Sequence, residues 1–209
     1  MTADPAFWNA LAEEYARKPV ERPEAFERKI AHTRERITPT SVVLDIGCGT
    51  GSLALRLAPG AAHVHGLDMS SEMVRIARTK AAASSTSNVT FHEGPFDEAF
   101  TAFEDGSLDG ICAYSILHLV DDHRAALARI ARLLEPGGFL VSSTPCLGES
   151  WVPYRPVLWA LRKMGKAPMV KIISRQQLAV DMRAAGFVDL TQPDVGAGPH
   201  IAFVLARRA

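Results

Sequence analysis

An acidic residue and three glycines stand close together near the start of the chain, in a spacing that suits nucleotide binding. The acid is Asp45, and the glycines follow at alternate positions: Gly47, Gly49 and Gly51. Residues 42–46 are mostly apolar, which is typical of a strand buried on both faces, and residues 52–57 are typical of a helix. Glycines between a strand and a helix allow a tight turn and let a ligand approach main-chain N–H groups. The stretch therefore predicts a ligand site at a strand end.

The spacing of the glycines distinguishes between ligands. A dinucleotide fingerprint has the order Gly-x-Gly-x-x-Gly, which aims a helix N-terminus at a pyrophosphate. Here the third glycine comes one residue early, and Asp45 precedes the first glycine by two residues. A carboxylate is a poor neighbour for a diphosphate and a good neighbour for an ammonium group. The pattern therefore favours a ligand that carries a positive ammonium.

The order Asp-x-Gly-x-Gly-x-Gly resembles motif I of the class I S-adenosylmethionine (SAM) methyltransferases. The resemblance implies that SAM is the cofactor and that S-adenosylhomocysteine (SAH) is its product. It also implies that the amino-acid end of the cofactor lies against Asp45 and the turn residues Gly47, Cys48 and Gly49. Cys48 is interpreted as a small, unreactive residue of this turn.

A second acid follows at the spacing that a ribose requires. Asp68 ends a predicted strand over residues 63–68 and stands 19 residues after Gly49, where a βαβ unit places an acid that accepts both ribose hydroxyls. The resemblance implies that Met69, directly after this acid, packs on the adenine. Enzymes that use NAD share the acid, so an NAD-dependent oxidoreductase is the alternative of a different class. The early third glycine and Asp45 argue against it.

The third predicted strand, residues 88–94, ends in a departure from the family. Where the family has Gly-Asp-Ala, with the acid bound to the adenine amine, this chain has Gly94, Pro95 and Phe96. Proline offers neither a carboxylate nor an N–H group. The adenine contact is then left to the backbone or ring of Phe96, or to the acids at positions 97 and 98. The departure also leaves open a SAM-binding protein that has lost catalysis.

The fourth predicted strand and its exit, residues 106–120, resemble a family segment that ends in a Leu-His pair. Ligands of open α/β sheets lie at the carboxyl ends of the strands, so Tyr114, Ser115 and His118 are expected to face the site. Ser115 is assigned to the cofactor. His118 is assigned to the substrate and to catalysis, as a base that takes a proton from the acceptor, with packing of the strand exit as its alternative role.

Cys146 follows the fifth predicted strand, residues 139–144, and is expected to line the substrate pocket without acting as a nucleophile. The strand is preceded by a Leu-x-Pro-Gly-Gly turn, which is a further feature of the family. Residues 41–144 match the class I pattern at five places in the right order.

Aromatic residues flank the predicted core at both of its ends. Residues 5–37 are predicted to form two helices, and Tyr15 is expected to cover the methionine part of SAM, or else to pack within its helix. Trp151 and Tyr154 lie in an insertion, residues 145–175, and are expected to contact the substrate. Residues 151–175 contain six basic residues and no acid. The insertion is interpreted as a lid over an apolar or anionic substrate, and residues 151–175 as a region of peripheral contact with a membrane. The alternative is a solvated surface helix.

These elements predict one α/β domain over residues 1–209. Its expected parts are a helical cap (1–40), a SAM-binding core (41–144), the lid insertion (145–175), and a closing helix with two strands (176–209). The expected architecture is a Rossmann-like, doubly wound sheet of seven strands, mostly parallel, with an antiparallel last strand. The chain of 209 residues is long enough for such a core.

The composition restricts the partners and the compartment. The 23 basic residues balance the 23 acidic ones, so the chain lacks the overall positive charge of a nucleic-acid binder, and no nucleic-acid partner is expected. Three widely spaced cysteines suit a reducing compartment and argue against a disulfide framework or a metal site. The first residues do not resemble a signal peptide, and the expected location is cytoplasmic. The sequence contains no signal for an oligomeric state.

The sequence therefore predicts a SAM-dependent methyltransferase that acts on a small molecule and resembles the ubiquinone- and menaquinone-biosynthesis type. A lipid headgroup N-methyltransferase at a membrane surface is the alternative within the class, because of the basic and aromatic insertion. The acceptor atom is not readable from the residues.

Overall fold

The structure is a computed structural model that describes residues 5–150, 152, 154–164 and 167–209. Its centre is a seven-stranded sheet with the strand order β3-β2-β1-β4-β5-β7-β6. The strands are β1 (Val42–Ile46), β2 (His63–Asp68), β3 (Val89–Glu93), β4 (Leu108–Tyr114), β5 (Leu134–Pro145), β6 (Phe187–Thr191) and β7 (Ile201–Arg208). β7 pairs antiparallel with both of its neighbours, and the other pairings are parallel. The predicted fold class is confirmed.

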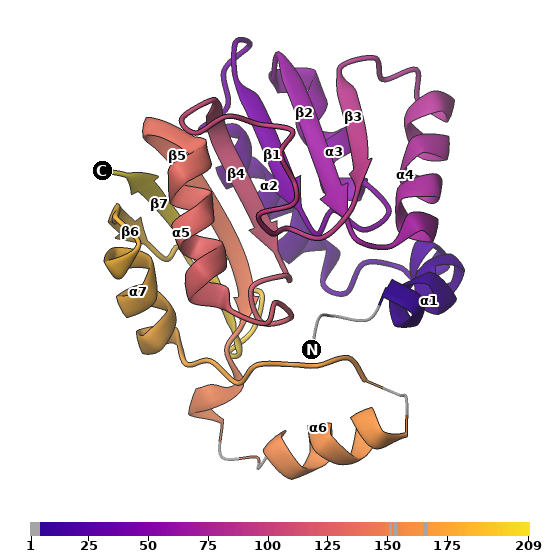
Figure 1. Cartoon of the computed structure of the whole chain (residues 1–209), viewed down its shortest axis with the longest axis vertical. Helices are drawn as coiled ribbons and strands as arrows, with labels where there is room; N and C mark the ends of the chain where they lie inside the picture. The colour runs from indigo at the N-terminus through magenta and orange to yellow at the C-terminus, as the bar shows by residue number, and fades with distance from the viewer. Residues whose placement is uncertain (1–4, 151, 153, 165–166) are drawn as a thin grey trace.

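Helices cover both faces of the sheet, with α5 and α7 in front of it and α2 and α3 behind it in Figure 1. The described helices are α1 (Pro5–Arg17), α2 (Pro23–Arg34), α3 (Ser52–Leu57), α4 (Ser71–Ala83), α5 (His123–Leu133), α6 (Tyr154–Lys163) and α7 (Arg175–Ala184). Two short 3₁₀ turns, η1 (Ala58–Gly60) and η2 (Leu147–Glu149), complete the order. None of the helices that the described residues form is long and apolar enough to cross a membrane.

The two-sided cover explains the apolar runs of the sequence. Successive strand residues point to opposite faces, so Val43 belongs to the core cluster on one side and Leu44 to the cluster on the other. Both side chains are fully buried. The same alternation holds for Ile111 and Cys112 in β4. A parallel strand with helices on both faces needs apolar residues at consecutive positions, which is the pattern that predicted β1.

The start of β5 differs clearly from the prediction. β5 begins at Leu134 instead of residue 139, because Leu134 already pairs with Leu108 across the neighbouring strand. The register then shifts between Leu108 and Gly110, and this irregularity accommodates the Pro-Gly-Gly residues inside the strand. Gly137 has a positive φ of 83°, as a turn-like residue in this position requires.

The carboxyl ends of the parallel strands meet at one edge of the sheet, with α1 and α6 next to it (Figure 1). β7 runs in the opposite direction, so its first residue, Ile201, lies opposite Pro145 at the end of β5. The segment between β6 and β7 therefore reaches the same edge as the predicted site. This edge is called the carboxyl edge below.

Candidate functional site

The glycine turn after β1 is bonded to the end of β2. The N–H groups of Gly47 and Cys48 both donate to the carbonyl of Leu67, at 2.8 and 3.0 Å. All three glycines of the turn have φ values between 54° and 76°, a region that other residues rarely adopt. A Cβ on Gly51 would stand 2.7 Å from the ring of Phe91, whereas one on Gly49 would meet only Tyr15, at 3.8 Å. Gly51 is thus required by packing, and Gly49 faces the open side of the turn.

Asp68 holds the turn from the neighbouring strand. Its Oδ2 accepts the N–H of Gly49 at 2.9 Å, and its Oδ1 accepts the N–H of Ser70 at 2.9 Å. Burial raises the pKa of Asp68, while these two N–H donors lower it. Each carboxylate oxygen keeps a second lone pair, so the carboxylate fits the pair of ribose hydroxyls that the sequence assigns to it.

Asp45 is the most unusual group of the site. Its side chain is 1% exposed, and its Oδ2 has no hydrogen-bond partner among the described residues. Burial and the negative charge of Asp68 raise its pKa to about 8. A buried polar atom without a partner is costly, and a cationic group beside it would favour the carboxylate form. Asp45 therefore fits the ammonium group of SAM.

The cap helix α1 lies over this turn. Tyr15 contacts Gly49, although 55% of the side chain remains exposed. Its partial burial and the carboxylates of Asp68 and Asp45 raise the pKa of its phenol. α1 is fixed by Asn9, whose Oδ1 accepts from Ser70 Oγ at 2.6 Å and from the N–H of Glu72 at 3.3 Å, at the start of α4. The structure thus brings the predicted residue Tyr15 next to the two acids.

Asn9 is a site residue that the sequence reasoning missed. It ties α1 to Ser70, two residues after Asp68, and nothing in a local sequence pattern distinguishes it from the other polar residues of the helix.

The predicted adenine segment is split between two environments. Gly94 donates its N–H to the carbonyl of Asp68 at 2.9 Å, and Pro95 is exposed. Phe96 instead packs against the main core, where the guanidinium of Arg129 stands 5.4 Å from the centre of its ring. The Phe96 ring therefore packs against a residue of α5, whereas Gly94 is bonded to Asp68 at the end of β2.

The cysteine of the turn is buried and inert. Cys48 is 8% exposed, and burial with the nearby carboxylates of Asp45 and Asp68 raises the pKa of its thiol well above the usual value. This agrees with its interpretation as a small turn residue.

The exit of β4 separates the three residues that were expected to face the site. Ser115 is exposed and adopts a left-handed φ of 55°, with its N–H donating to the carbonyl of Ser143 at 2.7 Å. Tyr114 instead points to α2, where its hydroxyl lies 2.8 Å from Thr33 Oγ1 and 3.2 Å from the carbonyl of Lys29. Tyr114 is therefore tied to the α2 face of the sheet.

His118 is 9% exposed, and its Nδ1 has no partner among the described residues. Burial lowers the pKa of the imidazole to about 4, so the ring is neutral at physiological pH and its Nδ1 or Nε2 is an acceptor. The segment before α7 crosses here, because the N–H of Lys171 donates to the carbonyl of His118 at 2.7 Å.

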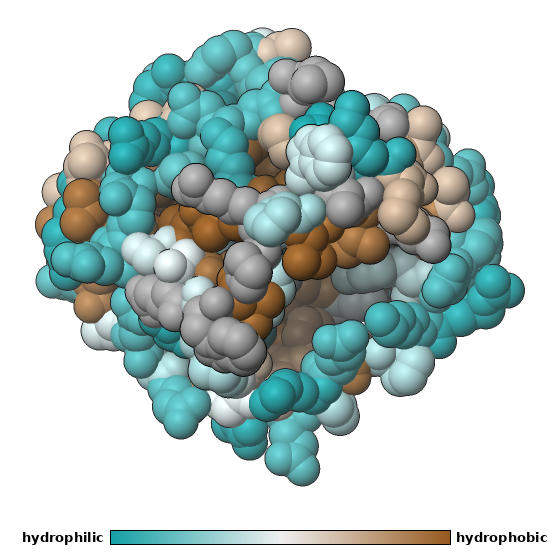
Figure 2. Space-filling view, turned by 90° about the horizontal axis from the view of Figure 1, so that it is seen from below, coloured by the Kyte–Doolittle hydropathy of each residue, from teal (hydrophilic) through white to brown (hydrophobic). Residues whose placement is uncertain are grey.

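A cavity of about 570 Å³ lies beneath the start of α6. Its wall combines apolar and polar residues. The apolar ones are Leu147, Val152, Pro156, Ile172 and Ile173, and the polar ones are Tyr154, His123, Ser150, Ser174 and Gln177. Figure 2 looks onto the carboxyl edge and shows a hollow bordered by hydrophobic residues. Of the other predicted substrate residues, Cys146 is 1% exposed and belongs to the main core cluster, so its thiol forms no part of an open wall. Trp151 lies outside the described residues.

One polar network beside this cavity was also missed. His123 lines the cavity at the start of α5, and its Nε2 lies 2.7 Å from Oδ2 of the buried Asp181 in α7. Arg124 and Gln177 contact the other oxygen of Asp181, both at 2.9 Å. The network fastens α7 to α5. Its partners are 58 residues apart, which is why no local motif indicated it.

The strand order defines the chain as a Rossmann-like α/β protein whose order reverses between β1 and β4, the place where open α/β sheets bind ligands. Comparison with known proteins then specifies the family. Residues 43–138 match the family model described as a methyltransferase domain. Together with motif I and the reversed β7, this match shows that residues 43–138 form a methyltransferase domain similar to those of the class I SAM-dependent methyltransferases.

Individual relatives agree. The chain is 34% identical over 150 residues to a ubiquinone biosynthesis O-methyltransferase of Aromatoleum aromaticum, covering 69% of this chain and 62% of the relative. It is 35% identical over 158 residues to O-methyltransferase cnsE of Penicillium expansum, covering 71% and 53%. The chain thus spans about half the length of the curated relatives it matches. A SAM-dependent methyltransferase structure from Aquifex aeolicus shares the fold, with a TM-score of 0.70, 18% identity and 99% of each chain covered.

The raised pKa of Asp45 predicts how stability depends on pH. The unfolded chain loses this proton near pH 4 and the folded chain near pH 8, so the folded state binds more protons between these values and loses stability as the pH rises. The Asp45→Asn variant has no carboxyl group to ionise at this position. We therefore expect its free energy of unfolding to exceed that of the wild type by on the order of 2–4 kcal/mol near pH 8. Urea unfolding at pH 5, 6.5 and 8 measures the difference.

Asp105→Asn is the control, because the side chain of Asp105 is 70% exposed. A wild type and an Asp45→Asn variant with parallel stability curves over this range would contradict the assignment of a buried, unpartnered acid.

Proposed function

We propose that this protein transfers a methyl group from SAM to a hydroxyl of a small, apolar or anionic acceptor. The single observation that carries the proposal is the buried Oδ2 of Asp45, which has no hydrogen-bond partner among the described residues and lies beside a glycine turn and a second acid. An ammonium group of a bound ligand satisfies this atom, and SAM combines that ammonium with a ribose. The names of the relatives, which are O-methyltransferases, support oxygen as the acceptor atom.

The residues of the turn and the strand ends hold the cofactor in this proposal. Asp45 and the backbone of residues 47–49 bind the amino-acid end, and Asp68 accepts the ribose hydroxyls. Residues 94–96 and Met69 border the adenine, and Tyr15 covers the turn. When bound, SAM supplies a methyl group that its sulfonium has already activated. The chain then contributes position and the exclusion of water.

The cavity under α6 is the proposed acceptor site. The apolar part of its wall suits a hydrophobic molecule, and Tyr154 is the residue of the wall that carries a phenol hydroxyl. The other lining residues come from the start of α5, from η2 and the residues after it, and from the residues around the start of α7.

A binding and transfer experiment tests this function. We expect calorimetric titration to give micromolar SAH binding and no NAD binding, and methyl-labelled SAM to label members of a panel of phenols and hydroxylated acids. Asp68→Asn keeps the size of the side chain and removes its charge, so SAH affinity falls by about 1–3 kcal/mol. Glu93→Gln is the matched control, because Glu93 ends the neighbouring strand opposite Asp68 and is exposed.

Binding of NAD in place of SAH would overturn the cofactor assignment. Tight SAH binding without transfer to any member of the panel would favour a SAM-binding protein that has lost catalysis. Equal affinity of Asp68→Asn and the wild type would show that the ribose is held elsewhere.

His118 is proposed to orient the acceptor hydroxyl. Its lowered pKa makes the imidazole a weak base, but keeps it neutral and able to accept a hydrogen bond throughout the physiological range. Its Nδ1, buried and without a partner among the described residues, is the proposed acceptor of that bond.

Two substitutions separate this role from proton removal. His118→Asn places an amide oxygen close to where Nδ1 stood, and His118→Leu removes every acceptor. If His118 orients the hydroxyl, we expect His118→Asn to retain most of kcat and His118→Leu to lose about tenfold or more, with SAH affinity unchanged in both. Loss of kcat in both variants, with a flattened pH profile, would identify a base instead.

A second candidate is methylation of a lipid headgroup at a membrane surface. α6 and the residue after it expose three large apolar residues, Val157 (46%), Trp159 (66%) and Met164 (58%). Residues 151–175 add basic charge without an acid. Exposed apolar side chains beside basic ones suit an anionic lipid surface.

Sedimentation with vesicles tests this contact. We expect the protein to sediment at low salt with vesicles that contain phosphatidylglycerol and to remain in solution with pure phosphatidylcholine. Trp159→Ser reduces the bound fraction, whereas Val180→Ser, an equally exposed apolar residue of α7, leaves it unchanged. Failure to sediment with either vesicle removes the candidate.

A further inference from the structure

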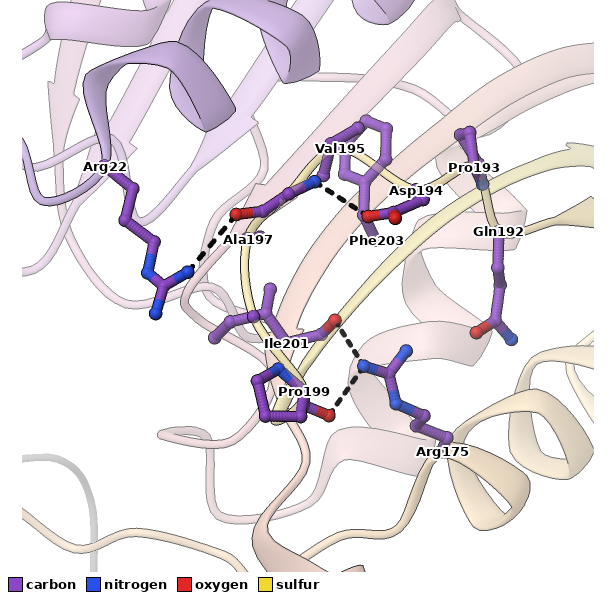
Figure 3. Close-up of a pocket in the computed structure, with 12 residues that line it drawn as sticks. Arg22, Arg175, Gln192, Pro193, Asp194, Val195, Ala197, Pro199, Ile201 and Phe203 are labelled. Atoms are coloured by element: carbon purple, nitrogen blue, oxygen red, sulfur yellow. Dashed lines mark hydrogen bonds between the residues drawn. The ribbon is translucent and has the colours of Figure 1, made fainter.

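A second cavity lies at the carboxyl edge, where the segment between β6 and β7 passes the start of α2. Its volume is about 490 Å³, and none of the residues that line it lines the cavity under α6. The wall consists of segment 192–199 with Arg22, Arg175 and Phe203. Figure 3 shows the two arginines approaching this segment from different elements, Arg22 from the start of α2 and Arg175 from the start of α7.

Three arginines converge on the backbone of the segment. Arg175 Nη2 donates to the carbonyls of Pro199 and Ile201, both at 2.8 Å. Arg28 Nε donates to the carbonyl of Val195 at 2.9 Å. The bond from Arg22 Nη1 to the carbonyl of Gly196 is longer, at 3.4 Å. Arg22 is therefore held more weakly than the other two.

The segment contains glycines where the arginines approach. Gly196 has a φ of 69°, and a Cβ on it would clash with Arg28 Nη2. Gly198 has a φ of 96°, and a Cβ on it would stand 3.3 Å from Arg22 Cζ. Arg22 itself has a left-handed φ of 53°, a strained conformation for a residue with a side chain. The absence of a Cβ at Gly196 and Gly198 leaves room for the guanidinium groups beside this segment.

Positive charge exceeds negative charge in the wall. Asp194 is the only acid among the lining residues, and its Oδ1 already accepts the N–H of Gly196 at 2.8 Å. Arg22 forms no ion pair within the part of the chain that the structure describes. A guanidinium has five N–H donors, and one long hydrogen bond uses a single one of them.

We infer that this cavity binds an oxyanion, the carboxylate or phosphate group of a small-molecule ligand, between Arg22 and Arg175. Guanidinium groups match the geometry of both oxyanions and bind them through paired N–H donors. The site shares no residue with the proposed cofactor contacts, so it does not depend on methyl transfer. Gln192 contributes an amide at the same wall.

The test is an NMR titration of ¹⁵N-labelled protein with inorganic phosphate and, separately, with benzoate, at constant ionic strength set by chloride. We expect saturable shifts of the Gly196, Ala197 and Gly198 amides and of the Nε–H signals of Arg22 and Arg175. The anion that saturates at the lower concentration identifies the ligand as a phosphate or a carboxylate.

Variants make the assignment specific. Arg22→Gln weakens the binding about tenfold, and Arg22→Lys restores part of it. Arg36→Gln is the matched control, because Arg36 is an exposed arginine just beyond the other end of α2 and lines neither cavity. Shifts that do not saturate, or that are spread evenly over exposed arginines and unchanged in Arg22→Gln, would show only non-specific screening and overturn the inference. SAH binding measured on the same samples reports the proposed cofactor site separately.

Discussion

Two buried carboxylates at the ends of adjacent strands determine the electrostatics of the carboxyl edge. Asp68 is satisfied by two backbone N–H groups, one of them from the glycine turn, so it connects the turn to β2. Asp45 lies beside it, and one of its oxygens has no hydrogen-bond partner among the residues that the structure describes, while the charge of Asp68 raises its pKa. The two acids therefore differ: Asp68 is satisfied within the fold, whereas the charged form of Asp45 is the one that a cationic ligand would favour.

The sheet supports this arrangement because it is packed on both faces. Alternate residues of β1 enter the two core clusters, which leaves β1 no freedom to slide or rotate. Its end, and therefore Asp45 and the glycine turn, has a fixed position. The strand order reverses between β1 and β4, so the helices that follow these strands lie on opposite faces and leave the edge between them open. Rigid strands thus carry a site made of strand ends and loops.

The sequence predicted those parts of the site whose cause is local. β2 has the predicted bounds, and Asp68 stands at its end, because an apolar run and an acid at a fixed distance from a glycine turn are visible along the chain. The surroundings of the Phe96 ring were not predicted, because the ring packs beside Arg129, 33 residues further along the chain. The burial of Cys146 and the role of Asn9 likewise depend on elements that approach only after folding. Such contacts cannot be predicted from the spacing of neighbouring residues.

The reversed direction of β7 has a practical consequence. Its first residue lies at the carboxyl edge, opposite the end of β5, and Arg207, near its other end, pairs with Phe139 within β5. The N–H of Ala209 donates to the carbonyl of Gly186, so the chain leaves the sheet on the side away from Asp45 and the cavities. A fluorophore, affinity handle or surface anchor attached after Ala209 would point away from bound ligands. Immobilisation through that end presents the binding edge to solution.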